Sequence, residues 1–417
     1  MQTEKDEEKI IARYGLVADV KFCKRCVVSN QRPSSTNEYF HTIHTKHKTI
    51  SFDEDGVCYA CRVNEAKDKT IDWKEREERL KELLDRYRSK DGSYDILVPG
   101  SGGKDSSFQA HTLKYKYNMH PLTVTWSPHI YTDIGWKNFQ NWIHKGGFDN
   151  FLFTPNPKIH RLLTRLAFEN LLHPFQPFII GQKTFAPKMA AKFSIKLIMY
   201  GEMPGEYGAN VSTSESRFKT EGSESNGFST DYTLGKDIRD LYLGGVRIAE
   251  IADKYNLMMG DLEPYFPMNP KIIKEKEIEF HFLGYYLKWV PQECYYYAVE
   301  HTGFEANSER TEGSYSKYNS IDDRIDGFFY YTRVIKFGIG RANYDAAQEI
   351  RNHHLTREEG VALVKRFDTE FPRKYFKEIL EYLDISEERF WEIIDQFRSP
   401  HLWEKIEGKW VLKHHVW

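Results

Sequence analysis

The fold is decided by one stretch of sequence, Asp95-Ile96-Leu97-Val98-Pro99-Gly100-Ser101-Gly102-Gly103-Lys104-Asp105-Ser106. An apolar run typical of a strand breaks into glycines, and a pattern typical of a helix follows from Asp105 to Tyr117. Gly102 and Gly103 allow a tight turn and a close approach of the backbone to a ligand. The free N–H groups at the start of the helix attract an anion. This stretch therefore predicts a phosphate-binding loop rather than a plain Gly-Ser turn.

The loop is not a Walker A motif, which requires Gly, four residues and then Gly-Lys-Ser/Thr. Val98 stands where the first glycine is required, and Asp105 stands where Ser or Thr is required. Hydrolysis of a γ-phosphate is therefore not the expected chemistry. The expected phosphate contacts are the hydroxyls of Ser101 and Ser106 and the ammonium of Lys104. Asp105 is expected to cap the helix or to help hold Mg²⁺.

Outward from the loop, strands alternate with helices, which predicts a doubly wound parallel α/β sheet. Ligands of such sheets lie outside the carboxyl ends of the strands, and both the loop and Gly201-Glu202 fall at that edge. The expected strands are 95–98, 121–126, 150–154 and 196–200, and the expected helices are 72–90, 105–117, 135–145, 158–172 and 185–193.

Three regions are predicted. Residues 1–71 hold an N-terminal arm, helical over 1–20, and a zinc module. Residues 72–235 form the ATP-binding α/β domain, in which the Gly/Ser/Thr/Glu-rich segment 203–235 is a surface loop, either a mobile lid or a disordered insertion. Residues 236–417 are expected to be mainly helical, to include one long helical stretch over 344–367, and to bind the substrate or a partner.

The overall charge argues against nucleic acid or a membrane as a partner. The 417 residues carry a formal net charge of −2, which gives no long-range attraction to nucleic acid or anionic lipid, although a local basic patch is compatible with it. The charged N-terminus lacks the apolar region of a secretory signal. No apolar run approaches the length of a membrane span. A cytoplasmic location is therefore expected.

Four of the five cysteines form two C-x-x-C pairs. Without an export signal, metal binding is a better interpretation of such pairs than disulfides. Four thiolates make a closed tetrahedral zinc site with a structural role; an iron–sulfur cluster and redox pairs are the alternatives. The predicted zinc ligands are Cys23, Cys26, Cys58 and Cys61.

Other chemically active side chains are given structural or surface roles. The lone Cys294 lies among tyrosines without a nucleophile elbow, so a buried structural thiol is expected. His41, His44 and His47, between the cysteine pairs, are expected to be solvated, and His129 is expected to be a surface residue.

The loop resembles the PP-loop of the ATP pyrophosphatase superfamily, whose members form an adenylate and release pyrophosphate. An ordered set of further motifs, from about residue 21 to the C-terminus, resembles the N-acetyl sugar amidotransferase family of lipopolysaccharide and pseudaminic-acid biosynthesis. These motifs are Cys-Lys-Arg-Cys-Val-Val-Ser-Asn-Gln-Arg-Pro at 23–33, Asp-Gly-Val-Cys at 55–58, Pro-Gly-Ser-Gly-Gly-Lys-Asp-Ser at 99–106, Thr-Trp-Ser-Pro-His at 125–129, Gly-Gln-Lys at 181–183, Tyr-Gly-Glu at 200–202 and Lys-Phe-Gly-Ile-Gly-Arg-Ala-Asn-Tyr-Asp-Ala at 336–346.

The resemblance implies conversion of an acetamido group on a nucleotide-linked sugar to an acetamidino group, with ATP split to AMP and pyrophosphate. Transfer of AMP to the amide oxygen makes an imidate-like adenylate that ammonia attacks. Because the chain shows no glutaminase nucleophile, a separate glutaminase partner is expected. In the family such partners resemble the two subunits of imidazole glycerol phosphate synthase, with a cyclase-like subunit and an ammonia tunnel.

The same resemblance places further residues at the site. Thr125 and Trp126 stand where superfamily members hold adenosine, although core packing explains Trp126 equally well. Glu202 is expected to bind Mg²⁺ or to orient ammonia. The alternative interpretation is a solvated carboxylate in a loop. The candidates for substrate contacts are Gln182, Lys183, Arg341 and Asp345; a surface arginine at a helix start is the alternative for Arg341.

Two other functions remain open on sequence grounds. A PP-loop enzyme that thiolates or amidates tRNA is the main rival, and it generally needs a basic surface and often a cysteine near the sheet edge. A nucleotide-sensing scaffold without catalysis is the second. Salt-dependent tRNA binding distinguishes the first, and the absence of ATP–pyrophosphate exchange distinguishes the second.

Overall fold

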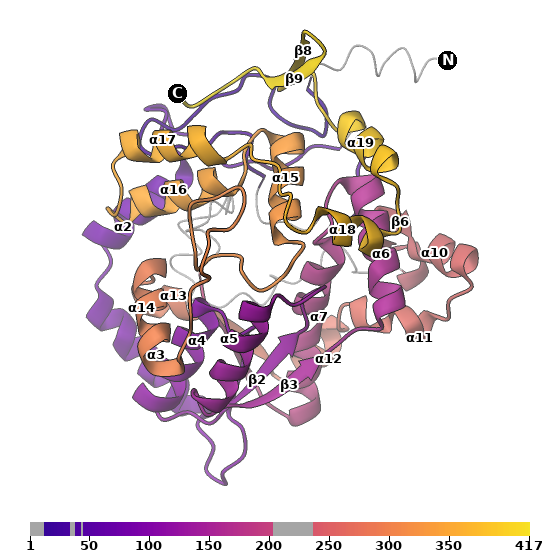
Figure 1. The fold of residues 1–417 in the computed structure, drawn as a ribbon. Helices are drawn as coiled ribbons and strands as arrows, with labels where there is room; N and C mark the ends of the chain where they lie inside the picture. The colour runs from indigo at the N-terminus through magenta and orange to yellow at the C-terminus, as the bar shows by residue number, and fades with distance from the viewer. Residues whose placement is uncertain (1–11, 34–37, 43–44, 203–236) are drawn as a thin grey trace.

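A five-stranded parallel sheet lies at the centre of the α/β part of the protein in the computed structural model (Figure 1). The structure describes residues 12–33, 38–42, 45–202 and 237–417. The strand order is β3-β2-β1-β4-β7, and each neighbouring pair is parallel. The strands are β1 (Ile96–Pro99), β2 (Pro121–Trp126), β3 (Asp149–Phe153), β4 (Leu197–Tyr200) and β7 (Glu279–Phe282).

Helices cover both faces of the sheet, which makes it doubly wound as predicted. Alternate residues of a strand point to opposite faces, so Ile96 and Val98 pack in one cluster with α3, α4 and α5, while Leu97 packs in another with α7. Burial on both faces explains why β1 and β2 read as continuous apolar runs. The helices of this part are α3 (Trp73–Tyr87), α4 (Lys104–His111), continued by a π-helical turn η1 (Thr112–Lys116), α5 (Asp133–His144), α6 (Pro157–Leu171) and α7 (Gln176–Phe193).

The helices and strands that the sequence predicts for the α/β part are present, but several of them begin or end at other residues than expected. Helix α7 begins at Gln176, nine positions before the expected start at residue 185. Its early turns hold Pro177 and Gly181, which weaken a helical pattern. The fifth strand, β7, comes from the region expected to be mainly helical, and its four residues are too few to show a clear strand period.

The C-terminal region is mainly helical, with two small hairpins. Where one long helical stretch was expected over 344–367, the chain forms two helices, because a turn separates α16 from α17. The elements are η3 (Ile238–Asp240), β5 (Tyr242–Leu243), β6 (Val246–Arg247), α10 (Ile248–Tyr255), α11 (Met259–Leu262), η4 (Glu263–Tyr265), α12 (Pro270–Glu275), α13 (Leu283–Tyr286), α14 (Pro291–Thr302), α15 (Asp326–Phe337), α16 (Arg341–Arg351), α17 (Arg357–Phe367), α18 (Phe376–Leu383), α19 (Glu387–Gln396), β8 (Trp403–Ile406) and β9 (Lys409–Leu412).

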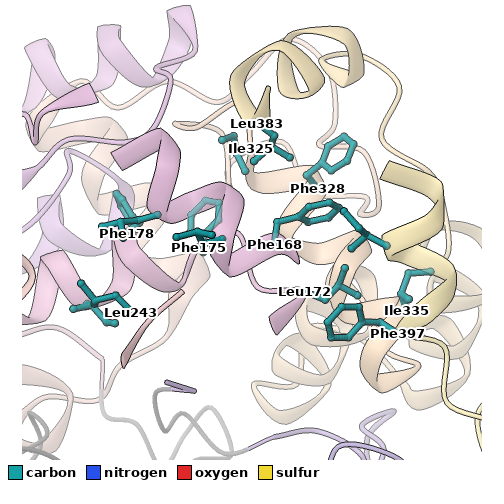
Figure 2. Close-up of a cluster of buried hydrophobic side chains, with 14 of the residues drawn as sticks. Phe168, Leu172, Phe175, Phe178, Leu243, Ile325, Phe328, Ile335, Leu383 and Phe397 are labelled. Carbon is teal, nitrogen blue, oxygen red and sulfur yellow. The ribbon is translucent and has the colours of Figure 1, made fainter. Parts of the chain in front are cut away.

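One large apolar cluster joins the two regions (Figure 2). The Phe168 ring at the end of α6 stacks on the Phe390 ring of α19, with ring centroids 5.3 Å apart. Phe328 of α15 packs edge-on to the Phe390 ring. Phe175 and Phe178 extend the cluster along the start of α7. Burying such rings stabilises a protein by about 1.5–3 kcal/mol each. The C-terminal helices are therefore fixed to the α/β part.

The N-terminal module docks on the C-terminal helices α16 and α17. All four pair-forming cysteines share a buried cluster with Ala346, Ala347 and Val364, and α2 (Tyr59–Lys69) lies beside α16 (Figure 1). The side-chain amide of Asn343 donates to the carbonyl of Val27 at 2.8 Å, and the guanidinium of Arg32 lies over the Tyr344 ring at 4.6 Å. The module thus supports the first turn of α16.

The helical arm expected over 1–20 does not form in residues 12–20, which make turns and bends. Leu16 is held in the large apolar cluster instead. The rest of the arm and the expected loop 203–235 lie outside the described residues. Over the described ranges, no helix is both long and apolar enough to cross a membrane.

Candidate active site

The glycine loop, residues 100–106, makes a tight turn between β1 and α4. Gly102 has φ +83°, and a Cβ at this position would lie 2.7 Å from the Phe139 Cα, so only glycine fits here. Gly103 is the N-cap of α4. The Ser106 hydroxyl accepts from the Gly102 N–H and donates to the Gly103 carbonyl, both at 3.1 Å. Ser106 therefore stabilises the turn, whereas its expected role was to contact phosphate.

Lys104 and Asp105 form an ion pair at the start of α4, with 2.5 Å between Nζ and Oδ2. Burial opposes the charge of Lys104, but the attraction and hydrogen bond of Asp105 outweigh it, so the lysine pKa is raised. The second oxygen of Asp105, Oδ1, is buried without a hydrogen-bond partner. An unpaired carboxylate oxygen beside an anion-binding turn suits a bound cation, since Mg²⁺ prefers carboxylate oxygens.

A cavity of about 330 Å³ opens at this loop, a size within the range of small-molecule sites. It brings together eight of the residues expected from sequence, among them Glu202, which follows β4 by two positions. These eight are Ser101, Gly102, Gly103, Lys104, Asp105, Gln182, Glu202 and Arg341. Because Glu202 lines this cavity, the alternative of a solvated loop carboxylate does not fit its position.

Arg341 enters the cavity from the C-terminal region, as the first residue of α16. It is 9% exposed, so the interpretation as a surface arginine is wrong. Its guanidinium lies between the rings of Tyr330 and Tyr344, 4.7 and 5.0 Å from their centroids. Burial opposes its charge, but Asp345, 2.9 Å from Nε, outweighs this and raises the arginine pKa.

Five expected site residues do not line the cavity, and one of them is Ser106, which holds the glycine loop from within. The Thr125 hydroxyl donates to the Gly100 carbonyl at 2.7 Å and so supports the loop from behind. Trp126 is buried among Phe153, Tyr265 and Gly181, where a Cβ on the glycine would meet the indole at 2.3 Å, so packing accounts for its position. The other two are Lys183, which is partly buried on α7, and Asp345, which lies behind Arg341.

Replacing Asp345 with alanine is expected to destabilise the protein by about 3–5 kcal/mol, because it leaves the Arg341 charge buried without its partner. The Asp345 carboxylate is 1% exposed and also accepts from Ser314 Oγ at 2.5 Å. Urea unfolding measures the loss. The matched control is Asp85→Ala, which removes, on α3, a 68% exposed partner of Arg88 and is expected to cost about 0–1 kcal/mol. Equal effects of the two variants would contradict the buried pair.

The site also contains residues that sequence reasoning missed. Three aspartates at the start of α15, two in the preceding turn and one at its first residue, line the cavity together with aromatic side chains. Three acidic residues within five positions were a visible signal, but the same pattern suits a helix start. The missed residues include Asp322, Asp323, Asp326, Phe175, Phe178, Tyr318, Tyr330 and Tyr344.

His129 is buried, which corrects its expected surface position. Its imidazole is fully enclosed, and Nδ1 lies 2.8 Å from the Asp323 carboxylate. The expectation for His41 and His47 is also wrong, since both bond to Glu38 and are largely buried. Burial lowers the pKa of His41. His44 lies outside the described residues.

The four paired cysteines form the predicted metal cluster. Their Sγ atoms lie within 4.8 Å of one another, with 3.9 Å between Cys23 and Cys61 and 3.7 Å between Cys26 and Cys58. Zn–S bonds of about 2.3 Å in a tetrahedron require Sγ atoms about 3.8 Å apart, so the cluster fits Zn²⁺. The backbone N–H groups of Arg25, Cys26 and Cys58 point to Cys23 Sγ at 3.3–3.5 Å, which suits a thiolate.

Taken together, the structure is that of an α/β protein with a doubly wound parallel sheet, a glycine loop at the carboxyl edge of that sheet and a four-cysteine cluster that could hold a metal ion. Residues 312–416 match the family described as LPS biosynthesis protein WbpG-like, C-terminal domain. Over these residues the chain is similar to that domain, and the expected resemblance to lipopolysaccharide biosynthesis proteins is confirmed over this part.

Solved structures show weaker likenesses. The NMN synthetase of Francisella tularensis is 10% identical with a TM-score of 0.25, over 57% of this chain and 89% of that one. The NH3-dependent NAD synthetase of Campylobacter jejuni is 11% identical with a TM-score of 0.25, over 56% and 94%. The NAD+ synthetase of Burkholderia pseudomallei is 15% identical with a TM-score of 0.24, over 60% and 97%. TM-scores this low establish nothing further about this chain. No curated protein matches it in sequence.

Proposed function

We propose that this chain is an ATP-dependent N-acetyl sugar amidotransferase, which converts an acetamido group of a nucleotide-linked sugar to an acetamidino group in the synthesis of a bacterial surface glycan. One observation carries the proposal. The cavity has the glycine loop as one wall and residues of the WbpG-like domain as the other, among them Asp322, Arg341 and Tyr344. In this proposal, a nucleotide and a glycan intermediate bind side by side in this cavity.

The chemistry follows from the weakness of an amide as an electrophile. ATP binds with its leaving phosphates at Lys104 and the N-terminus of α4, and Asp105 and Glu202 are the candidate Mg²⁺ ligands. Attack of the amide oxygen on the α-phosphorus releases pyrophosphate and makes the oxygen part of a good leaving group, AMP. Ammonia then attacks the carbon, and AMP departs. Arg341 and Gln182 are the candidate contacts to the sugar nucleotide.

Ammonia comes from a separate glutaminase in this proposal, delivered through a cyclase-like partner subunit. Cys294 is the only cysteine outside the metal cluster. It is buried, and burial first, then the nearby carboxylate of Asp105, raises its pKa well above the ordinary value. A thiol that resists ionisation is a poor nucleophile, so a glutaminase step in this chain is not expected.

The test is mass spectrometry of a UDP-diacetamido sugar incubated with the purified protein, ATP and ammonium. Replacement of O by NH lowers the product mass by roughly one unit, with AMP and pyrophosphate formed in equal amounts. Glutamine without a partner is expected to give no product. Efficient turnover with glutamine alone would contradict the partner, and tight salt-dependent tRNA binding without sugar turnover would favour the tRNA-modifying alternative.

A further inference from the structure

The guanidinium of Arg341 is held in one orientation at the cavity lining. It lies between the rings of Tyr330 and Tyr344, 4.7 and 5.0 Å from their centroids. The Tyr344 ring also contacts the guanidinium of Arg32, which comes from the N-terminal module, at 4.6 Å. A planar guanidinium between two rings keeps its plane and presents only its edge. The edge is therefore the part of Arg341 that a ligand meets.

The hydrogen-bond donors on this edge are only partly used. A guanidinium has five N–H groups. Nε is enclosed and faces Asp345 at 2.9 Å, and Nη1 donates to the Tyr330 hydroxyl. In the part of the chain that the structure describes, Asp345 is the only carboxylate within 4.0 Å of Arg341, and Nη2 has no hydrogen-bond acceptor. The donors left for a ligand in the cavity are those of Nη2 and the second N–H of Nη1.

The backbone at the start of α16 offers no alternative anion site. The N–H of Ala342 donates to the Gly313 carbonyl at 3.0 Å, and the N–H of Asn343 donates to the Asp368 carboxylate at 2.7 Å. Such first-turn N–H groups are the ones that attract an anion to a helix N-terminus when they are free. An anion at this end of α16 therefore depends on the side chain of Arg341.

Arg341 and Lys104 are the two basic residues among those that line the cavity. They come from different regions of the chain, since Lys104 starts α4 and Arg341 starts α16. In the proposed function the leaving phosphates of ATP take Lys104. Arg341 is then left for an anionic group of the second substrate.

We propose that Arg341 binds an oxyanion of the acceptor sugar nucleotide and so determines which acceptors the cavity takes. This inference rests on the proposed function. Parallel N–H groups of a guanidinium match two oxygens of a phosphate or a carboxylate, whereas a lysine ammonium offers only a point charge. An acceptor of this class can supply the oxyanion from two sources, the diphosphate that links sugar and nucleotide or a carboxylate on the sugar ring.

The test is isothermal titration of the full-length protein with UDP-N-acetylglucosamine and with UDP-N-acetylglucosaminuronic acid, which adds a carboxylate. Arg341→Lys keeps the charge and loses the fork, so the uronic acid is expected to bind about 10- to 100-fold more weakly. An equal loss with UDP-N-acetylglucosamine assigns the diphosphate, and an unchanged affinity for it assigns the carboxylate. A non-hydrolysable ATP analogue is expected to bind within a few-fold of the wild type, which also shows that the variant is folded.

Arg398→Lys is the matched control. Arg398 is 8% exposed, lies over the rings of Trp403 and Trp410 at 4.2 and 5.3 Å, and has Asp395 3.2 Å from its Nε. It therefore has the same kind of surroundings as Arg341, but it lies outside the cavity lining. Its replacement is expected to leave the affinity for both sugar nucleotides unchanged.

Other results would overturn the inference. These are an unchanged affinity for both sugar nucleotides in Arg341→Lys, no wild-type binding of either, or an equal loss for the ATP analogue, which would place Arg341 at the ATP phosphates. Tyr330→Phe keeps the ring and removes the acceptor of Nη1, so it is expected to weaken sugar-nucleotide binding by about 3- to 10-fold. It decides the question if Arg341→Lys does not fold. If the wild type binds these sugars through Arg341 but makes no amidine from any acetamido sugar, the proposed function fails and the oxyanion site stands.

Discussion

Lys104→Ala is expected to lower sugar-dependent ATP–pyrophosphate exchange by about 100- to 1,000-fold, the usual cost of removing one preorganised group that stabilises charge in a transition state. The ammonium is nearly buried at the start of α4, and Asp105 keeps it charged by raising its pKa. In the free enzyme the ion pair holds the lysine in place. In the proposed function, the phosphates of ATP offer the same ammonium a stronger set of acceptors.

The matched control is Lys188→Ala. Lys188 is also a partly buried lysine with one carboxylate partner, Glu263 at 2.8 Å, but it lies on α7 outside the cavity lining. Its exchange rate is expected to stay near that of the wild type. Wild-type exchange in Lys104→Ala would contradict the assignment of the glycine loop as the phosphate site.

Cys26→Ser is expected to have the largest effect on structure. A closed four-thiolate site contributes an apparent binding energy of about 10 kcal/mol or more to folding, as in small zinc domains. Loss of the metal is expected to loosen the module and, because Val27 accepts from Asn343 and Arg32 lies over Tyr344, to expose the first turn of α16. Zinc content by atomic absorption and hydrogen exchange of residues 341–351 measure the two effects.

Cys294→Ser is the control for that experiment, since it makes the same chemical change at a buried thiol outside the metal cluster. It is expected to keep the full zinc content and the protection of α16. If Cys26→Ser kept the zinc content and the protection of residues 341–351, the module would not be what supports the first turn of α16. Addition of a chelator to the wild type is expected to reproduce the Cys26→Ser result.

Local patterns in the sequence predicted the parts of this fold that depend on local chemistry. The strand over 121–126 has the expected ends, because its apolar run is bounded by Pro121 and by the turn after Trp126. The loop residues Ser101 to Asp105 line the cavity, and their predicted contact with phosphate, which rests on the free N–H groups at the start of α4, stays a prediction.

Contacts between residues that are far apart in the chain explain the site residues that the sequence did not predict. His129 and Asp323 meet across 194 positions, so no local pattern distinguishes this buried histidine from a surface one. Tyr330 and Asp326 enter the cavity only because the apolar cluster around Phe168 brings α15 against α6. Every residue of β2 is buried. The sequence around Trp126 therefore did not indicate whether a protein ring or a ligand covers its indole.

The docking of the module on α16 also bears on how the protein is made. The contact between Val27 and Asn343 spans 316 positions, and that between Glu38 and Lys336 spans 298. Contacts this distant form late, because the chain must pay the entropy of closing a very large loop first. On the ribosome, the cysteine pairs emerge long before the helix that covers them. Docking of the module must therefore wait until most of the chain has been synthesised, and the part of the cavity lining that carries Arg341 is among the last parts of the protein to be completed.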